Sequence, residues 1–231
     1  KDTVMTLLRN SSSVILNNVS KLIHEKLPVE RQQLVEEFAS SLFANLARED
    51  LDKRVDVDLY GAALSLFNDF YEASTAQANI RVFNPELGKH GWESENTIVQ
   101  IVINDLPFLV DSVRMALNRL KITSHLLLHT PIKVNRNESG VATEIVNLKD
   151  ENKASHQQTV FLIEVDRQPE QQHLDALTKE LQSVLADVSV AVEDWKPIQK
   201  MLAECIAGAK KAKVKNKADQ KDSLEFLNWI A

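Results

Sequence analysis

Two histidines that stand four residues apart, His125 and His129 in the stretch HLLLH, are the first candidates for chemistry in this sequence. On a β-strand this even spacing places both imidazoles on one face but ~13 Å apart, which is too far for one metal ion to bridge. On a helix the two could be ligands, but Ile122 and the leucines between the histidines favour a strand. We therefore predict no metal site in this stretch.

Several carboxylates and the single cysteine are the next candidates, as an acid–base pair and a nucleophile. The carboxylates are Glu93, Glu95, Asp105 and Asp111. Their spacing does not bring two of them together with a nucleophile, so we predict surface solvation or helix capping. Cys205 lies beside Leu202 and Ile206 in a helical pattern, which favours a buried structural thiol. No catalytic residue is predicted.

The stretch QIVINDLPFLVDSVRMAL, residues 100–117, contains a strand-to-helix transition that we call the elbow, residues 104–111. An apolar run stops at Asn104-Asp105, passes through Pro107 and continues as a helical pattern. The first turn of a helix exposes N–H groups that can bind an anion. Phosphate-binding turns need glycines for close approach, and Phe108 stands here instead, so neither a dinucleotide site nor a P-loop is predicted. Helix capping by Asn104 or Asp105 and a small-ligand or interface loop both stay open.

Residues 1–79 are predicted to be a helical segment of three helices, broken near 20–28 and 50–56. Apolar residues recur there at helical spacing and form one stripe on each helix. They are Leu34, Phe38, Leu42 and Leu46, and then Tyr60, Leu64, Phe67 and Tyr71.

Residues 80–200 are predicted to form an α+β domain. After a loop at 84–96, strands are expected at 97–103, 122–135, 158–166 and 188–192, with a hairpin arm at 141–148. Helices are expected after Pro107 and over residues 174–185. This β-α-β-β-α-β order predicts a ferredoxin-like antiparallel sheet with both helices on one face. The N-terminal helices or a second subunit must then cover the other face.

Residues 201–231 are predicted to hold a helix, a lysine-rich linker and the start of a further element. Residues 209–221 contain six lysines and little apolar material, which favours a solvated linker over a site for an acidic partner. Apolar character returns in SLEFLNWIA, residues 223–231.

The composition is ordinary for a globular protein, with 44% hydrophobic and 26% charged residues in a chain of 231. A net charge of −6 argues against nucleic acid as a partner, because phosphate binding needs a clustered basic surface. A single cysteine excludes an internal disulfide and suits a reducing cytoplasm. No apolar run is long enough to span a bilayer and no secretory signal opens the chain, so we expect a cytoplasmic protein without a membrane partner.

Residues 82–136 carry motifs that are more distinctive than their separate parts. These are Gly91-Trp92-Glu93-Ser94, the run from Asn104 to Val113 and the HLLLH stretch. Together they resemble the N-terminal region of the very large bacterial NAD-specific glutamate dehydrogenases. The stretches DVDLYGAALSLFNDF (56–70) and EFLNWIA (225–231) agree, so the resemblance spans nearly the whole chain.

The resemblance implies a regulatory or assembly role without catalysis. The family's enzymes oxidise L-glutamate with NAD to 2-oxoglutarate and ammonium, and their catalytic and NAD-binding parts lie downstream of the region equivalent to this chain. No cofactor is therefore implied for the fragment itself, and its implied partners are the downstream domains, further copies in a homo-oligomer and an amino-acid effector. The N-terminal part is similar to ACT domains, which are βαββαβ modules that sense amino acids and mediate assembly.

The comparison with ACT domains reaches the elbow directly. ACT elbows typically read Asp-x-Pro-Gly-Leu-Leu, and residues 105–110 keep the Asp, the Pro and the apolar pair but have Phe108 in place of the Gly. The resemblance implies that Phe108 fills the gap through which an amino acid would reach the backbone. The elbow residues of interest, Asn104, Asp105, Pro107, Phe108 and Asp111, are therefore expected to serve packing or an interface. Amino-acid sensing and assembly through the sheet stay as alternatives.

Overall fold

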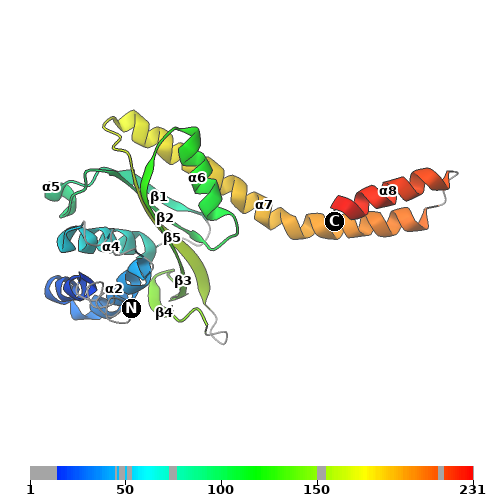
Figure 1. The fold of residues 1–231 in the computed structure, drawn as a ribbon. Coiled ribbons are helices and arrows are strands. Elements are labelled where there is room, and N and C mark those ends of the chain that lie inside the picture. Colours follow the sequence, from blue (N-terminus) through cyan, green and yellow to red (C-terminus); the bar gives the residue numbers. More distant parts are fainter. Residues whose placement is uncertain are drawn as a thin grey trace, which may run out of the picture. The chain divides into compact units, whose positions relative to one another are not determined.

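A five-stranded sheet is the centre of the first part of the molecule (Figure 1). The computed structural model describes residues 15–44, 46, 50, 54–72, 77–149, 155–212 and 216–230. The chain falls into two units, the first ending at Leu185 and the second beginning at Ala186. In sheet order, the strands are β1 (Asn79–Phe83), β2 (Thr97–Asn104), β5 (His156–Val165), β3 (Ser124–Arg136) and β4 (Ala142–Val146). Every neighbouring pair is antiparallel.

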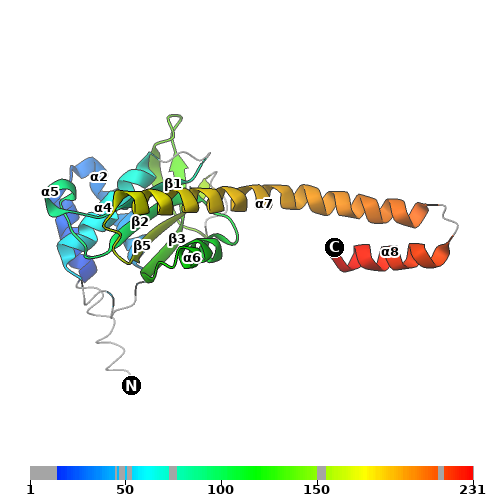
Figure 2. The ribbon, with the colours of Figure 1, turned by 90° about the horizontal axis from the view of Figure 1, so that it is seen from above.

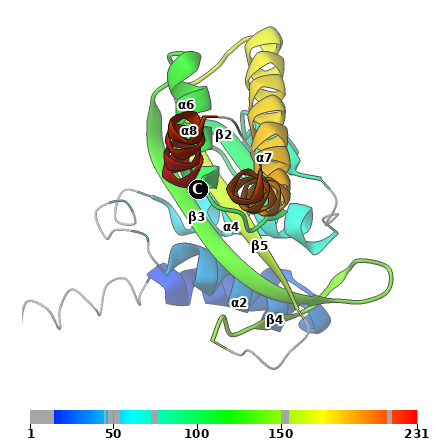
Figure 3. The ribbon, with the colours of Figure 1, turned by 90° about the vertical axis from the view of Figure 1, so that its right-hand side faces the viewer.

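Helices cover both faces of this sheet. Residues 15–26 are helical and precede α2 (Val29–Phe43) and α4 (Asp56–Tyr71), which lie on one face (Figure 1). On the other face, α6 (Leu109–Arg119) lies beside residues 171–185 of α7 (Gln171–Lys211), as Figures 2 and 3 show. An ion pair of 2.6 Å between Arg119 Nη1 and Glu180 Oε1 joins these two helices. A short helix, α5 (Leu87–His90), lies within the predicted loop.

The central strands explain why both faces need a cover. In β2 and β5 nearly every side chain is buried, so neither strand has a polar side that could face water. Alternate residues such as Ile98 and Leu162 belong to the core shared with the N-terminal helices. The residues between them, such as Ile101 and Phe161, are also fully buried and point to the opposite face.

The N-terminal helices contribute an aromatic cluster to the first of these two cores. The ring of Phe38 lies 5.5 Å from that of Phe67 and 5.1 Å from that of Phe70, and all three side chains are fully buried. Aromatic rings in such tilted and edge-on contacts add about 0.5–1.5 kcal/mol per pair beyond their burial. The cluster packs α2 against α4, and the core that contains it also includes Ile98 and Leu162 of the sheet, so the helical segment and the sheet share one core.

Arg136, at the end of β3, ties α4 to the sheet through a half-buried guanidinium. Its Nη2 donates to the Phe70 carbonyl at 2.7 Å and to Gln158 Oε1 at 2.6 Å. Its Nη1 donates to the carbonyls of Tyr71 at 3.1 Å and Gly140 at 2.7 Å. The carbonyls of Phe70 and Tyr71 lie at the negative end of the α4 dipole, where a cation is favourable. Burial lowers the pKa of Arg136 from its ordinary value.

A second cation, Arg81 on β1, joins the same helix to the other edge of the sheet. Its Nη2 donates to the Ser65 hydroxyl on α4 and, at 2.5 Å, to Gln100 Oε1 on β2. Its Nε lies 3.1 Å from Asp69 Oδ2 without the alignment of a hydrogen bond. Burial raises the pKa of Asp69, and the Arg81 charge offsets part of that rise.

The predicted fold class, an α+β domain with a ferredoxin-like antiparallel sheet and a helical lead-in, is confirmed. The N-terminal helices cover the second face of the sheet. One predicted strand is wrong, because residues 188–192 continue α7. The leucine spacing of 174–185 runs on without a helix breaker, and Val188 and Val192 are partly buried at a spacing of one helical turn. The edge beside β2 belongs instead to β1, a five-residue strand that the sequence analysis did not predict.

The second unit contains the rest of α7 and the helix α8 (Lys217–Ile230), which runs back alongside it (Figure 2). Gln220 Nε2 donates to the carbonyls of Ala209 at 2.6 Å and Ala212 at 3.2 Å, which links the two helices. The expectation of a buried thiol is wrong, since Cys205 is exposed on α7. None of the helices within the described residues is long and apolar enough to cross a membrane.

Gly61 on α4 is predicted to contribute to stability because Trp92 lies directly against it. A Cβ at position 61 would lie 2.4 Å from Trp92 Cβ, so Gly61→Ala should lower the free energy of unfolding by about 1–3 kcal/mol. Urea unfolding followed by circular dichroism measures this. Gly208→Ala is the matched control, since Gly208 is also helical and a Cβ there meets nothing within 4 Å. Equal stability of Gly61→Ala and the wild type would contradict the contact.

Candidate functional site

The elbow places a left-handed residue at the start of α6. The helix begins at Leu109, and its N-cap residue Phe108 has φ 69° and ψ 3°. No side chain caps the helix, so the expected capping by Asn104 or Asp105 is wrong. Pro107 lies in the turn before the helix, and Asp111 lies in the first turn, where its negative charge is favourable to the helix dipole.

Asp105 binds the neighbouring strand. Its Oδ1 accepts a hydrogen bond from Thr159 Oγ1 at 2.5 Å, and its Oδ2 accepts one from Gln157 Nε2 at 2.6 Å. Its backbone N–H donates to the Gln157 carbonyl at 3.0 Å. Because β5 lies beside β2, the carboxylate fixes the elbow to the sheet, and this role explains why it does not reach the helix N-terminus.

ACT elbows have a glycine at this position, and Phe108 was expected to fill the gap that the glycine leaves. It does not fill it. Its side chain is 71% exposed, and a cavity of about 200 Å³ lies at the elbow. The residues around this cavity are Asp105, Leu106, Phe108, Leu109, Val110, Asp111, His129, Thr159 and Phe161. The backbone keeps the positive φ that a glycine adopts without strain, at a cost of about 1–3 kcal/mol for a bulky residue.

The two histidines of the HLLLH stretch have different neighbours. The imidazole of His129 stacks on Phe161, with ring centroids 6.1 Å apart. His125 Nε2 lies 2.8 Å from Asp166 Oδ1. Among the described residues, no group of three or more histidines, cysteines or carboxylates is placed to hold a metal ion.

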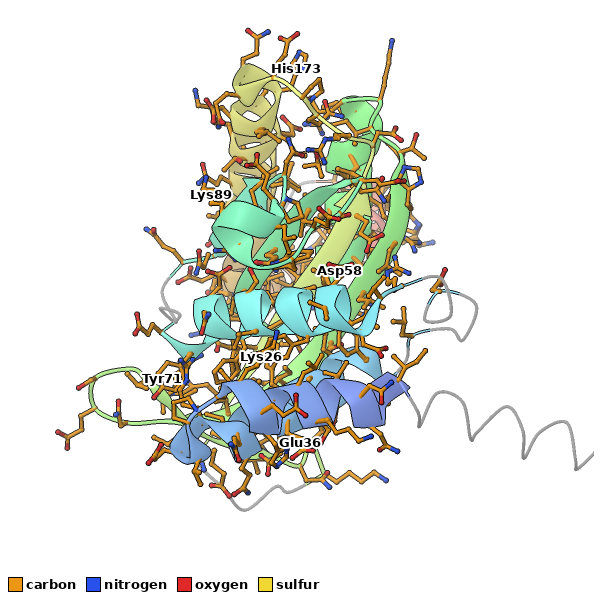
Figure 4. The ribbon with its side chains drawn as sticks, turned by 90° about the vertical axis from the view of Figure 1, so that its left-hand side faces the viewer. Lys26, Glu36, Asp58, Tyr71, Lys89 and His173 are labelled. Atoms are coloured by element: carbon orange, nitrogen blue, oxygen red, sulfur yellow. The ribbon has the colours of Figure 1, made fainter. Side chains whose placement is uncertain are left out.

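A larger cleft of about 1170 Å³ lies in the first unit, between the N-terminal helices, the loop after α5 and the sheet. Figure 4 shows this side of the molecule, with Asp58 on α4 and Lys89 on α5. Its apolar wall contains Phe43, Leu46, Val55, Leu59, Ala62, Pro85, Leu87, Trp92, Leu126 and Leu162. Its polar residues are Asp50, Arg54, Asp58, Glu86, Glu93, Ser94, Glu95, Asn96, His125, Glu164 and Arg167.

The Gly91–Ser94 motif forms one wall of this cleft. Gly91 ends α5 in the left-handed conformation, with φ 76°. Trp92 is buried and meets Phe83 edge-on, with ring centroids 6.1 Å apart. The Glu93 N–H donates to Asp58 Oδ1 at 3.1 Å, and the Ser94 carbonyl accepts from Arg167 at 2.9 Å. These contacts hold the loop to α4 and to the end of β5.

A bidentate ion pair forms the floor of the charged part of the cleft. Arg54 Nη2 lies 2.5 Å from Glu164 Oε2, and Arg54 Nε lies 3.2 Å from Glu164 Oε1. Arg54 Nη1 also donates to the Asp50 carbonyl at 2.5 Å. Both charged side chains are largely buried, at 20% and 14% exposure, and paired fork geometry is the arrangement that makes such burial tolerable.

Asp166 directly follows β5 and contacts His125, which lines the cleft. Its Oδ2 accepts the Thr123 N–H at 3.0 Å. Hydrogen bonds from the side chain and then the backbone of Thr123, followed by that from His125, hold the pKa of Asp166 below its ordinary value. The carboxylate is therefore ionised at neutral pH and fixes the bulged start of β3 to the end of β5.

The motif loop can be located from the sequence, whereas the residues opposite it cannot. Arg54 and Glu164 are separated by 110 positions, so no local pattern could pair them. One signal was available, because Glu164 is the one charged residue in the otherwise apolar run of residues 160–165. A buried charge in such a strand requires a partner from elsewhere in the fold.

Known proteins provide a comparison for this arrangement. Residues 38–181 match the family model described as glutamate dehydrogenase, ACT1 domain. The chain is 30% identical over 220 residues to the NAD-specific glutamate dehydrogenase of Halomonas elongata, covering 94% of this chain and 14% of that protein. It is 35% identical over 194 residues to that of Pseudomonas aeruginosa, covering 84% of this chain and 12% of that protein. The chain thus spans only a small part of the length of these relatives.

The strain at Phe108 gives a direct prediction. Phe108→Gly should be more stable than Phe108→Ala by about 1 kcal/mol, because glycine adopts a positive φ freely and alanine does not. Both variants remove the same exposed ring, so each serves as the control of the other. Urea unfolding measures the difference. If Phe108→Ala is the more stable of the two, the left-handed conformation at this position is contradicted.

Proposed function

Because the chain belongs to the glutamate dehydrogenase ACT1 domain family, we propose that it is a regulatory and assembly part of a large NAD-specific glutamate dehydrogenase. In this proposal the whole enzyme oxidises L-glutamate to 2-oxoglutarate and ammonium in the cytoplasm. The NAD site and the catalytic residues lie elsewhere in the longer polypeptide, and its downstream domains are the partners of this region. The family match over residues 38–181 carries the proposal.

The chemistry of the two hollows supports a role without catalysis. In the larger cleft, the most buried charges already satisfy each other in the Arg54–Glu164 pair. At the elbow, the Asp105 carboxylate is committed to Thr159 and Gln157. Groups that are fixed by structural hydrogen bonds are poorly placed to exchange protons with a substrate, which favours a binding or positioning role for both regions.

Amino-acid sensing at the elbow is the first alternative, and the retained backbone conformation favours it. Residue 108 keeps a positive φ, so the backbone before α6 has the conformation that a glycine would adopt there. Since the Phe108 ring points to solvent, the cavity beneath it is open to a molecule the size of a small amino acid. The N–H groups of the first turn of α6 would bind its carboxylate.

Assembly through the sheet is the second alternative, and the structure narrows it to the edges. Among the described residues, both faces of β2 and β5 are buried under helices, so an uncovered sheet face is not available for assembly. The outer edges of β1 and β4 pair with no strand of this sheet. An unpaired strand edge is a ready template for another chain.

The purified chain should show no glutamate-dependent reduction of NAD, because the proposal places the catalytic residues elsewhere. Absorbance at the wavelength of reduced NAD measures this, with a full-length family enzyme as the positive control. Turnover by the 231-residue chain would contradict the non-catalytic assignment.

Calorimetry with a panel of amino acids at millimolar concentration tests the sensing alternative. Binding at the elbow should be lost in Val110→Arg, which places a long side chain in the cavity. Met115→Arg is the matched control, because Met115 is an exposed residue of the same helix outside the cavity. Silence across the panel would reject sensing by this chain alone, and binding that survives in Val110→Arg would place the ligand elsewhere.

A further inference from the structure

The helices of the second unit expose a set of large apolar side chains that we call the hairpin patch. Its members are Val190, Trp195, Ile198 and Met201 on α7 and Phe226, Trp229 and Ile230 on α8. Trp229 is 81% exposed and Met201 63%. The rings of Phe226 and Trp229 stack on each other with centroids 6.3 Å apart, which concentrates aromatic surface at one place.

The members of this patch are exposed, whereas a different set of apolar residues on α7 and α8 is half-buried, among them Leu202, Ile206, Leu224 and Leu227. A two-helix hairpin buries one seam, and a second apolar surface on the same helices needs a partner from outside the hairpin. Large exposed aromatic and aliphatic side chains in this number are typical of an interaction surface.

The charges of the hairpin indicate which partner fits. Its lysine tip, residues 209–221, contains six lysines and one aspartate. The other end of the hairpin, residues 186–200, which we call the acidic base, contains three carboxylates and two lysines. Those carboxylates are Asp187, Glu193 and Asp194, whereas Glu225 already lies 3.8 Å from Lys221 of the tip.

We propose that the hairpin pairs with the hairpin of a second copy of this chain, in the antiparallel orientation. This orientation brings each lysine tip beside the acidic base of the other copy, whereas a parallel pair would bring like charges together. A two-fold axis makes both contacts equivalent, and the four helices form a bundle whose interior contains the two hairpin patches. The proposal rests on the assembly role proposed above and deepens it by naming the surface.

Sedimentation of the full 231-residue chain over a range of concentrations tests the pairing. The wild type should be a dimer at micromolar concentration, and Trp229→Glu and Met201→Glu should each be monomers because they place a charge in the patch. Val29→Glu is the matched control, since Val29 is 78% exposed but lies on α2 in the first unit. It should remain a dimer. Far-ultraviolet circular dichroism checks that each variant keeps its helices.

Charge reversal tests the orientation and leaves the apolar patch intact. Lys210→Glu with Lys211→Glu should weaken the dimer by roughly tenfold or more, which corresponds to about 1.4 kcal/mol. Adding Glu193→Lys and Asp194→Lys to the same chain should restore it, because the two ends then carry opposite charges again. Added salt should weaken the wild-type dimer, since the charged ends are exposed.

The outcomes separate this inference from the function it rests on. A dimer that persists in Trp229→Glu and in the lysine-reversed variant would overturn the hairpin interface, while assembly through a sheet edge would stand. A chain that is monomeric at all concentrations would overturn both the hairpin interface and assembly by this chain alone. Neither result bears on whether the chain turns over glutamate.

Discussion

The burial of β2 and β5 on both faces is the constraint on which the rest of the first unit depends. Strands that are apolar on every side cannot form one layer with water on either side. The helices α6 and α7 cover one face, and the N-terminal helices cover the other. Removing the N-terminal helices would expose a wide apolar surface, so the helical lead-in and the ferredoxin-like part are one folding unit.

This three-layer arrangement creates the two hollows described above. The larger cleft lies where the N-terminal helices meet the sheet, so it exists only because the lead-in packs on that face. The elbow cavity lies on the opposite side, under the start of α6. Polar residues fix the helices to the sheet at defined points, as Arg136 does at the end of α4. A ligand or partner that shifted one of these helices would therefore also displace the strands to which it is bonded.

The sequence predicts the parts of the fold that local pattern controls. The β-branched runs of β2 and β5 and the leucine spacing of α7 are found where they were expected. The prediction of a strand at residues 188–192 was wrong because a run of valines favours a strand locally. In the fold these residues continue α7, and β1 takes the position beside β2. Short strands with polar interruptions, such as the one containing Arg81, carry too weak a pattern to be recognised.

The candidate sites show the same division between local and distant information. The Gly91–Ser94 loop and the turn at Pro107 could be located because their residue types have local conformational meaning. The pairing of Arg54 with Glu164, and that of Asp105 with Thr159, depends on strand order and helix placement, which sequence pattern does not specify. The exposure of Phe108 likewise follows from its left-handed backbone, and an aromatic residue in the sequence gives no indication of that conformation.

The most direct test of the regulatory assignment compares a full-length enzyme of this family with a form that lacks the region equivalent to the whole first unit, which ends at Leu185. Steady-state NAD reduction, sedimentation and the response to amino acids are measured on both forms. We expect the shortened enzyme to retain turnover at saturating glutamate and to lose either its native assembly or its response to an amino-acid effector. An enzyme whose assembly and effector response are both unchanged after the removal would contradict the account.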